Sequence, residues 1–133
     1  MTDILDEYNR AMAVLNDLSA EYLTWAQGDL KKMEDIFLSA KSADFERKNQ
    51  LIAQDLFRVA HDMKGQGATF GYELITDIGN HLCRYIEQFD NFEEKQMNDI
   101  QVHMAALRQI LEKHLTGDGG ALGMALKEQV EAL

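Results

Sequence analysis

The chain has 133 residues, of which 46% are hydrophobic and 27% are charged, and its formal net charge is −10. This size and composition are typical of one globular domain, and no apolar run is long enough to span a bilayer. The acidic charge, with no basic run longer than Lys31-Lys32, argues against nucleic acid as a partner. The first residues lack the pattern of a secretory signal, and the lone Cys83 cannot form an internal disulfide. We therefore expect a soluble, cytoplasmic protein that binds neither nucleic acid nor membrane.

The first part of the chain is predicted to be helical. Proline is absent throughout, and apolar residues recur at spacings of three and four. The first helical region begins near Thr2 or Asp3, either of which can cap it, and Gly28-Asp29 is a candidate point of division into two helices. Its predicted core positions are Leu15, Leu18, Tyr22, Trp25, Met33, Ile36 and Phe37.

Three further helices are predicted, over residues of about 43–67, 72–89 and 92–115. The first of these has an apolar stripe at Ile52, Leu56, Val59 and Met63. Turn-forming residues separate the helices, at Gly71 and at Asp90-Asn91. Short connections between long amphipathic helices favour antiparallel neighbours. The expected fold is all-α: an up-and-down antiparallel four-helix bundle with an additional N-terminal helical segment and a short C-terminal tail.

The end of the chain differs in composition from the predicted bundle. We expect the bundle domain to occupy residues 1–115 and a flexible, glycine-rich break to follow it. Residues 121–133 could form a short amphipathic helix, but a helix of that length is marginal without a surface on which to pack. Residues 116–133 are therefore predicted to be a flexible break and a short tail.

Within the second predicted helix, residues 61–71 read HDMKGQGATFG and place three glycines beside a histidine and a lysine. At 100° per residue, His61 lies on the opposite side from Val59 and Met63, so it points away from the core. The positions that share its face are Phe57, Arg58, Lys64, Gly65 and Ala68. Glycine inside a helix costs about 1 kcal/mol relative to alanine. Gly65 therefore requires a compensating reason, such as close approach by another molecule.

The face around His61 suits phosphoryl chemistry. An exposed imidazole that is neutral near pH 7 is a good nucleophile and can accept a phosphoryl group. Phosphoryl transfer depends on cations placed against the phosphoryl oxygens; Lys64 is within reach of a group on His61, and Arg58 adds to the field. The alternative is an ordinary surface histidine among chance glycines, and face geometry leaves both interpretations open. The chain has no phosphate loop of the Gly-x-x-x-x-Gly-Lys type, so we do not expect a kinase with its own ATP site.

These residues carry a family resemblance. His61, Met63, Lys64 and Gly65 form the pattern His-x-hydrophobic-Lys-Gly, with Gly71 six residues further on. The pattern closely resembles the signature of histidine phosphotransfer (HPt) domains of bacterial phosphorelays, and the predicted bundle is similar to that family's fold. The resemblance implies that His61 is the phosphoacceptor and that Lys64 helps to hold the phosphoryl group. It also implies that Gly65 lets a receiver domain dock closely and that Gly71 serves the turn into the next helix.

The resemblance implies a phosphotransfer intermediate. Such a protein takes a phosphoryl group from an aspartyl phosphate on one response-regulator receiver domain and gives it to an aspartate on another. Its partners would be receiver domains, with a hybrid histidine kinase as a further candidate, and they would dock over Phe57, Arg58, Gly65 and Ala68. This chain would bind no cofactor, because the receiver's carboxylates would hold the Mg²⁺ for each step.

Two other functions stay open from the sequence. One is a non-catalytic helical module that docks a receiver or another helical partner without carrying phosphate. The other is a metal-binding four-helix protein, but His81 and Cys83 have no second pair of ligands, and no Glu-x-x-His motif occurs. We expect His81 and Cys83 to be structural, His103 and His114 to lie on helix flanks, and the Met and aromatic stripes to be core. Many HPt domains place a glutamine on the following helix near the phosphohistidine; here the candidates are Asn80, His81 and Cys83.

Overall fold

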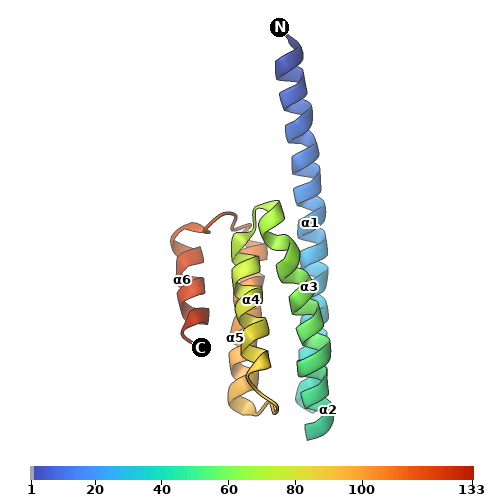
Figure 1. The fold of residues 1–133 in the computed structure, drawn as a ribbon, viewed down its shortest axis with the longest axis vertical. Helices are drawn as coiled ribbons and strands as arrows, with labels where there is room; N and C mark the ends of the chain where they lie inside the picture. Colours follow the sequence, from blue (N-terminus) through green and yellow to red (C-terminus); the bar gives the residue numbers. More distant parts are fainter. Residues whose placement is uncertain (1) are drawn as a thin grey trace.

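The structure, a computed structural model, describes residues 2–133, and all the regular elements in that range are helices. In chain order they are α1 (Thr2–Ser42), α2 (Phe45–Gln50), the π-helix η1 (Leu51–Leu56), α3 (Phe57–Gly67), the 3₁₀ turn η2 (Ala68–Phe70), α4 (Glu73–Glu87), α5 (Glu94–Glu112) and α6 (Gly120–Glu131) (Figure 1). None of these helices is both long enough and apolar enough to cross a bilayer.

A four-helix bundle forms the body of the molecule. Its four members are α1, the continuous segment α2–η1–α3, α4 and α5, which run alternately down and up in Figure 1. The all-α, up-and-down fold predicted from the spacing of apolar residues is therefore confirmed. The largest fully buried side chains are Tyr22, Met33, Ile52, Leu56, Ile75, Ile78, Leu82, Phe92, Ile100, Leu107, Ile110 and Leu111.

Helix α1 is continuous, so the predicted division at Gly28-Asp29 is wrong. One glycine in a helix interior costs only about 1 kcal/mol, and packing of an apolar face readily offsets that cost. Such a face runs past the glycine, from Tyr22 to Ala40, and is buried against the rest of the bundle. The additional N-terminal segment is accordingly not a separate helix but the free end of α1.

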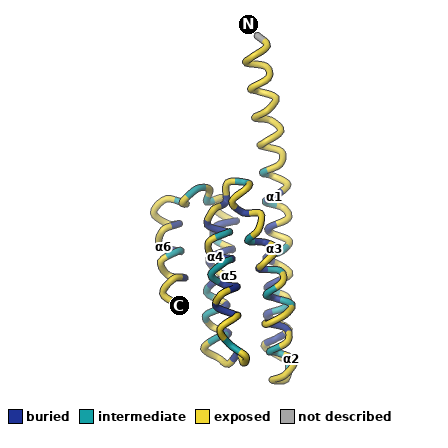
Figure 2. The backbone as a smooth tube through the Cα atoms, viewed as in Figure 1, coloured by how far each residue is buried: buried dark blue, intermediate teal, exposed yellow. Residues whose placement is uncertain are grey.

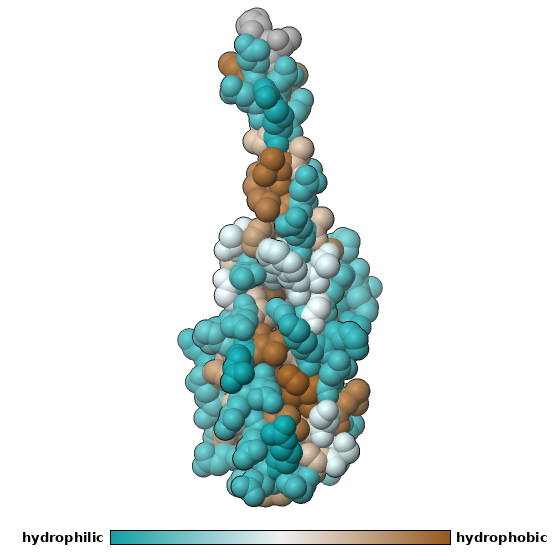
Figure 3. Space-filling model, turned by 90° about the vertical axis from the view of Figure 1, so that its right-hand side faces the viewer, coloured by the Kyte–Doolittle hydropathy of each residue, from teal (hydrophilic) through white to brown (hydrophobic). Residues whose placement is uncertain are grey.

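This free end, residues 3–21, is called the arm below, and it extends beyond the other bundle helices (Figure 1). Figure 2 shows it as exposed over nearly its whole length, and none of its side chains is buried. In Figure 3, apolar side chains gather on its surface. Three predicted core residues are thus exposed: Leu15 by 55%, Leu18 by 42% and, just beyond the arm, Trp25 by 56%. The spacing identified an apolar face correctly, but spacing does not reveal where the neighbouring helices end.

The second long helix is less regular than predicted. Asp44 caps α2, its side chain accepting a hydrogen bond from the Arg47 N–H at 2.8 Å. The chain then widens into η1, where the N–H of Phe57 reaches the carbonyl of Ile52, five residues back. Short π-helical segments often adjoin functional sites. Here the π-helix directly precedes the helical turn that carries His61.

The end of the chain folds back onto the bundle. After α5, residues 116–119 lead into α6, which lies against α4 and α5 (Figure 1). Leu126 and Val130 are buried there, and Lys127 Nζ lies 3.3 Å from a carboxylate oxygen of Asp77 on α4. This contact supplies the packing surface that so short a helix needs.

Candidate functional site

His61 lies on the outer face of α3 and is exposed. Its ring stacks on that of Phe57, one turn earlier, with centroids 6.1 Å apart and planes inclined by 29°. Residues four apart on a helix are neighbours, which accounts for this contact. The imidazole borders a shallow hollow of about 390 Å³. The hollow is lined by Ala53, Gln54, Phe57, Arg58 and His61. A partner can therefore reach the ring from solvent.

The exposed face continues toward the end of α3. Arg58, Gly65 and Ala68 are all exposed beside His61, whereas Phe57 is half-buried. Gly65 and Ala68 present little more than backbone. The structure thus brings the residues predicted for the docking face onto one side of the helix.

Two cations flank the imidazole along the helix. Arg58, one turn before His61, makes no ion pair with any residue that the structure describes. Lys64, one turn after, is half-buried, and its Nζ donates to Oδ1 of Asn80 at 3.1 Å. A lysine ammonium has three donors, so two are left for a ligand.

Helix α4 holds Lys64 at three points. The hydroxyl of Thr76 donates to the Lys64 carbonyl at 2.8 Å and accepts from the Ala68 N–H at 2.9 Å. A Cβ at Gly79 would lie 2.8 Å from Cβ of Lys64, so the glycine lets the two helices approach closely. Asn80, the next residue, then meets the ammonium group. Sequence reasoning left Asn80 as one of three candidates and missed Thr76 and Gly79, because their role depends on which residues of α4 face α3.

The three glycines of the motif lie in different surroundings. A Cβ at Gly65 would meet nothing within 4 Å. A Cβ at Gly67 would lie 2.7 Å from the carbonyl oxygen of Tyr72 and 2.8 Å from Oγ1 of Thr76. Gly71 ends η2 in the left-handed region, with φ of 85°, where side chains are strained. Packing inside the chain therefore explains Gly67, backbone conformation explains Gly71, and neither explains Gly65.

The prediction that His103 lies on a helix flank is wrong, because its side chain is fully buried between α4 and α5. Its Nδ1 lies 2.7 Å from the carbonyl oxygen of Asp99, and its Nε2 lies 2.9 Å from Nδ1 of His81. A carbonyl can only accept, so Nδ1 of His103 carries the hydrogen and Nε2 accepts from the Nδ1–H of His81. Burial lowers the pKa of His103 to about 4. This hydrogen-bonded pair links two bundle helices.

The other candidate side chains lie in structural surroundings. Cys83 is buried in α4, and burial raises the pKa of its thiol to about 11, which disfavours the reactive thiolate. His114 is exposed just after α5 and has a positive φ of 52°. Over residues 2–133, no group of three or more His, Cys, Asp or Glu side chains is placed to hold a metal ion.

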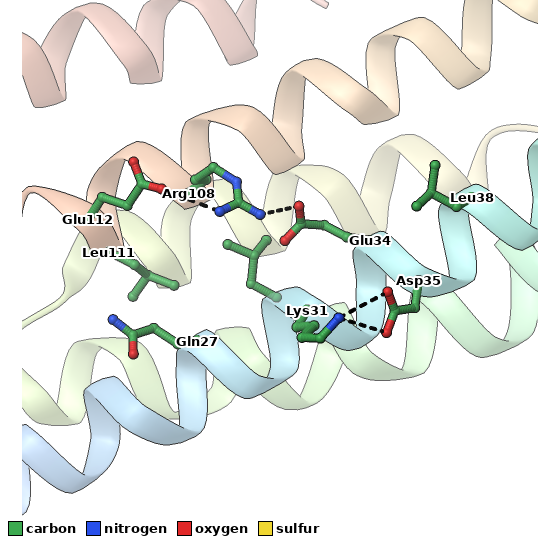
Figure 4. Close-up of a pocket in the computed structure, with 9 residues that line it drawn as sticks. Gln27, Lys31, Glu34, Asp35, Leu38, Arg108, Leu111 and Glu112 are labelled. Atoms are coloured by element: carbon green, nitrogen blue, oxygen red, sulfur yellow. Dashed lines mark hydrogen bonds and ion pairs between the residues drawn. The ribbon is translucent and has the colours of Figure 1, made fainter.

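A second hollow, of about 520 Å³, lies between α1 and α5 (Figure 4). Its charged side chains pair with one another. Arg108 bonds Glu34 and Glu112, and Lys31 Nζ lies 3.4 Å from a carboxylate oxygen of Asp35. No histidine or cysteine lines this hollow, so its residues offer no phosphoacceptor.

Residues 17–132 match the family model described as Hpt domain. The chain belongs to the Hpt domain family. The match begins within the arm and includes every bundle helix and α6, so the resemblance seen in the motif is confirmed over nearly the whole chain. Comparison with curated proteins and with solved structures gave no match. As an Hpt domain, the chain takes part in histidine phosphotransfer, and Hpt domains of phosphorelays interact with receiver domains.

Proposed function

We propose that this Hpt domain is a phosphorelay intermediate in which His61 carries the phosphoryl group. A ring nitrogen of His61 attacks the phosphorus of an aspartyl phosphate on a receiver domain. The N–P bond forms as the bond from phosphorus to the aspartate oxygen breaks, and the electron pair stays on the carboxylate. The second transfer is the same step in reverse, toward an aspartate of another receiver. The observation that carries the proposal is the exposed imidazole of His61 beside two cations.

Lys64 serves the transfer by holding positive charge near the phosphoryl oxygens. Phosphoryl transfer depends mainly on positioning and on such electrostatic stabilisation. The hydrogen bond to Asn80 restrains the ammonium group, so less side-chain entropy is lost when the phosphoryl group arrives. Arg58 adds positive charge on the opposite side of the ring. The Mg²⁺ for each step is held by the receiver's carboxylates, not by this chain.

Gly65 leaves room for the receiver. A receiver must bring its aspartate to His61, so its backbone has to come close to α3 in the turn next to the ring. The absence of any atom within 4 Å of the Cβ position at Gly65 means that the space is open to a partner. On the other side of His61, the side chains of Phe57 and Arg58 line the hollow that the ring borders.

The direct test is to incubate the purified chain with a panel of phosphorylated receiver domains and Mg²⁺ and to follow the label. We expect label on the wild-type chain that is lost in acid and survives alkali, as a phosphoramidate does. His61→Gln should abolish labelling while shifting stability by less than about 0.5 kcal/mol, because the residue is at the surface. A matched control is His114→Asn, at another exposed histidine, since Asn tolerates positive φ.

Two outcomes would contradict the proposal. Label that persists on His61→Gln would place the phosphoacceptor elsewhere. Receivers that bind without labelling either the wild type or the His114→Asn control would instead support a non-catalytic docking module.

A further inference from the structure

The turn that ends the His61 motif is tied to the last part of the chain. The carbonyl oxygen of Gly71, the final glycine of the motif, accepts a hydrogen bond from the Gly117 N–H at 2.8 Å. Gly117 has a positive φ of 61°, a conformation that glycine adopts without strain. In Figure 1, the connection from α5 to α6 lies at the same end of the bundle as the turn from α3 to α4. The chain after α5 therefore holds the turn that joins the His61 helix to α4.

Helix α6 covers the first turn of α4. Leu74 of α4 is buried, and a Cβ at Gly119 or Gly123 would lie 2.5 or 2.7 Å from its Cδ1. These two glycines let the backbone at the start of α6 lie directly on Leu74. One turn further along α4, Asp77 pairs with Lys127 of α6. The start of α4 is thus held in place by α6.

The opposite side of α4 holds Lys64. At 100° per residue, Thr76 lies about 200° around the helix from Leu74, and Asn80 lies one turn beyond Thr76. The Thr76 hydroxyl bonds the Lys64 carbonyl, and Asn80 accepts from the ammonium group. A helix behaves as a rigid element, so a shift of the first turn of α4 also moves Thr76 and Asn80 relative to α3. Release of α6 would therefore loosen the hold on Lys64.

We propose that residues 116–133 are a positioning element for phosphotransfer. By holding the start of α4, they keep the Lys64 ammonium group where it meets the phosphoryl group on His61. The inference rests on the proposed function of His61 and Lys64, and it adds a segment that does not contact the phosphoacceptor. None of residues 116–133 lines the hollow beside His61. Their effect on transfer is exerted through α4.

Docking of α6 depends on few buried residues, so one substitution should release it. The helix has 12 residues, too few to be stable alone, and its buried residues are Gly123, Leu126 and Val130. Leu126→Asp places an unpaired charge in this contact, which is costly, and should release α6. Met124→Asp adds the same charge to the same helix at a position that is 55% exposed, and it should leave α6 in place.

The lifetime of the phosphohistidine in the full chain tests the proposal, with circular dichroism to show that the bundle stays folded. Leu126→Asp should shorten the lifetime by about two- to fivefold, at most the effect of removing the ammonium group. Met124→Asp should leave the lifetime unchanged. In a Lys64→Ala background, Leu126→Asp should have no further effect, because the group through which it acts is absent.

Two results would overturn the proposal. An unchanged lifetime in folded Leu126→Asp would mean that α6 only stabilises the fold. Equal shortening by Leu126→Asp in the wild-type and Lys64→Ala backgrounds would mean that α6 does not act through Lys64. If Leu126→Asp does not fold, Leu126→Ala makes the same comparison with a smaller loss of packing.

Nuclear magnetic resonance of the unphosphorylated chain separates this inference from the phosphotransfer role. The side-chain amide resonances of Asn80 should shift in Leu126→Asp but not in Met124→Asp, because the hydrogen bond to Lys64 weakens when α6 is released. A wild-type chain that takes no label would contradict the role of His61. Asn80 resonances that stay unchanged while those of α6 show its release would contradict the positioning role, so the two failures are distinguishable.

Discussion

Gly65 and Gly67 lie two residues apart on α3, yet a Cβ at Gly65 would meet nothing within 4 Å, whereas one at Gly67 would collide with Tyr72 and Thr76. Histidines show the same contrast. His61 stands exposed on the outer side of α3, and His103 is fully enclosed between α4 and α5. The enclosed residues are explained by contacts inside the chain. Contacts inside the chain do not explain the exposed residues, so we infer that they contact another molecule.

The largest expected effect concerns the enclosed histidine. Its pKa in the folded chain is about 4, below the ordinary 6.5, so between these values the unfolded chain binds more protons than the folded one. Stability should therefore fall as the pH drops through this interval, by about 3 kcal/mol in all. Urea unfolding at a series of pH values measures it. His103→Gln should be less stable near pH 7 but should show a flatter pH dependence.

His61→Gln is the matched control for this experiment, because it removes an exposed imidazole. It should keep the wild-type pH dependence between pH 6.5 and about 4. The other groups around His103 are His81, Asp99, Tyr85 and Lys95, and they are common to all three proteins. If His103→Gln lost stability with pH as steeply as the wild type, the enclosed pair would not be the cause.

The next largest effect is the difference in stability between substitutions at Gly67 and at Gly65. Gly67→Ala should lower the free energy of unfolding by about 1–3 kcal/mol, because the added methyl group would press on the backbone of Tyr72. Gly65→Ala should leave it unchanged or raise it by up to about 1 kcal/mol, because alanine favours the helix and space is available. Thermal unfolding compares them. Equal effects on the two variants would remove the distinction between an open and a closed side of α3.

A smaller effect is expected for substitution of Lys64, which is half-buried between the exposed face of α3 and helix α4. Lys64→Ala should slow transfer and shorten the lifetime of the phosphorylated protein by roughly fivefold, the equivalent of about 1 kcal/mol. Asn80→Ala should shorten the lifetime less, because the ammonium group stays but is no longer restrained. Lys31→Ala, whose partner is Asp35 on exposed α1, should change neither quantity. High salt should reduce the difference between Lys64→Ala and wild type.

Should all three variants decay at the same rate, Lys64 would be an ordinary surface charge held by Asn80 for packing alone.

Much of this arrangement is predictable from the sequence. Apolar spacing gave the helices, and the same spacing placed His61 opposite Val59 and Met63, on a side that is exposed in the structure. Periodicity is a property of one helix, so these inferences need no knowledge of neighbours. The sequence shows the glycines of the motif, but it does not show why position 67 requires glycine. That requirement depends on the path of the backbone at Tyr72, which passes close to Gly67.

The incorrect predictions share a cause: the apolar spacing of one helix does not identify the elements that pack against it. The spacing of Leu15, Leu18 and Trp25 indicates an apolar face. It does not show that the other bundle helices leave these residues exposed. His103 is a polar residue, so the sequence predicts it on a helix flank. In the structure its buried ring is hydrogen-bonded to His81 of the neighbouring helix α4. Thr76 and Gly79 contact Lys64 only because α4 crosses α3 at that height.

The most direct test of the central claim is to measure unfolding and receiver-to-His61 transfer together for Gly, Ala and Gln at position 65. We expect Ala and Gln to leave the thermal midpoint near or above that of the wild type, because the Cβ position is open. Transfer should fall from Gly to Ala and strongly from Ala to Gln, as the side chain fills the space into which the receiver docks. Stability and transfer would then change in opposite directions. Transfer by Gly65→Gln at the wild-type rate would contradict close docking at Gly65, and unfolding by both substitutions would show that the glycine is required by the helix itself.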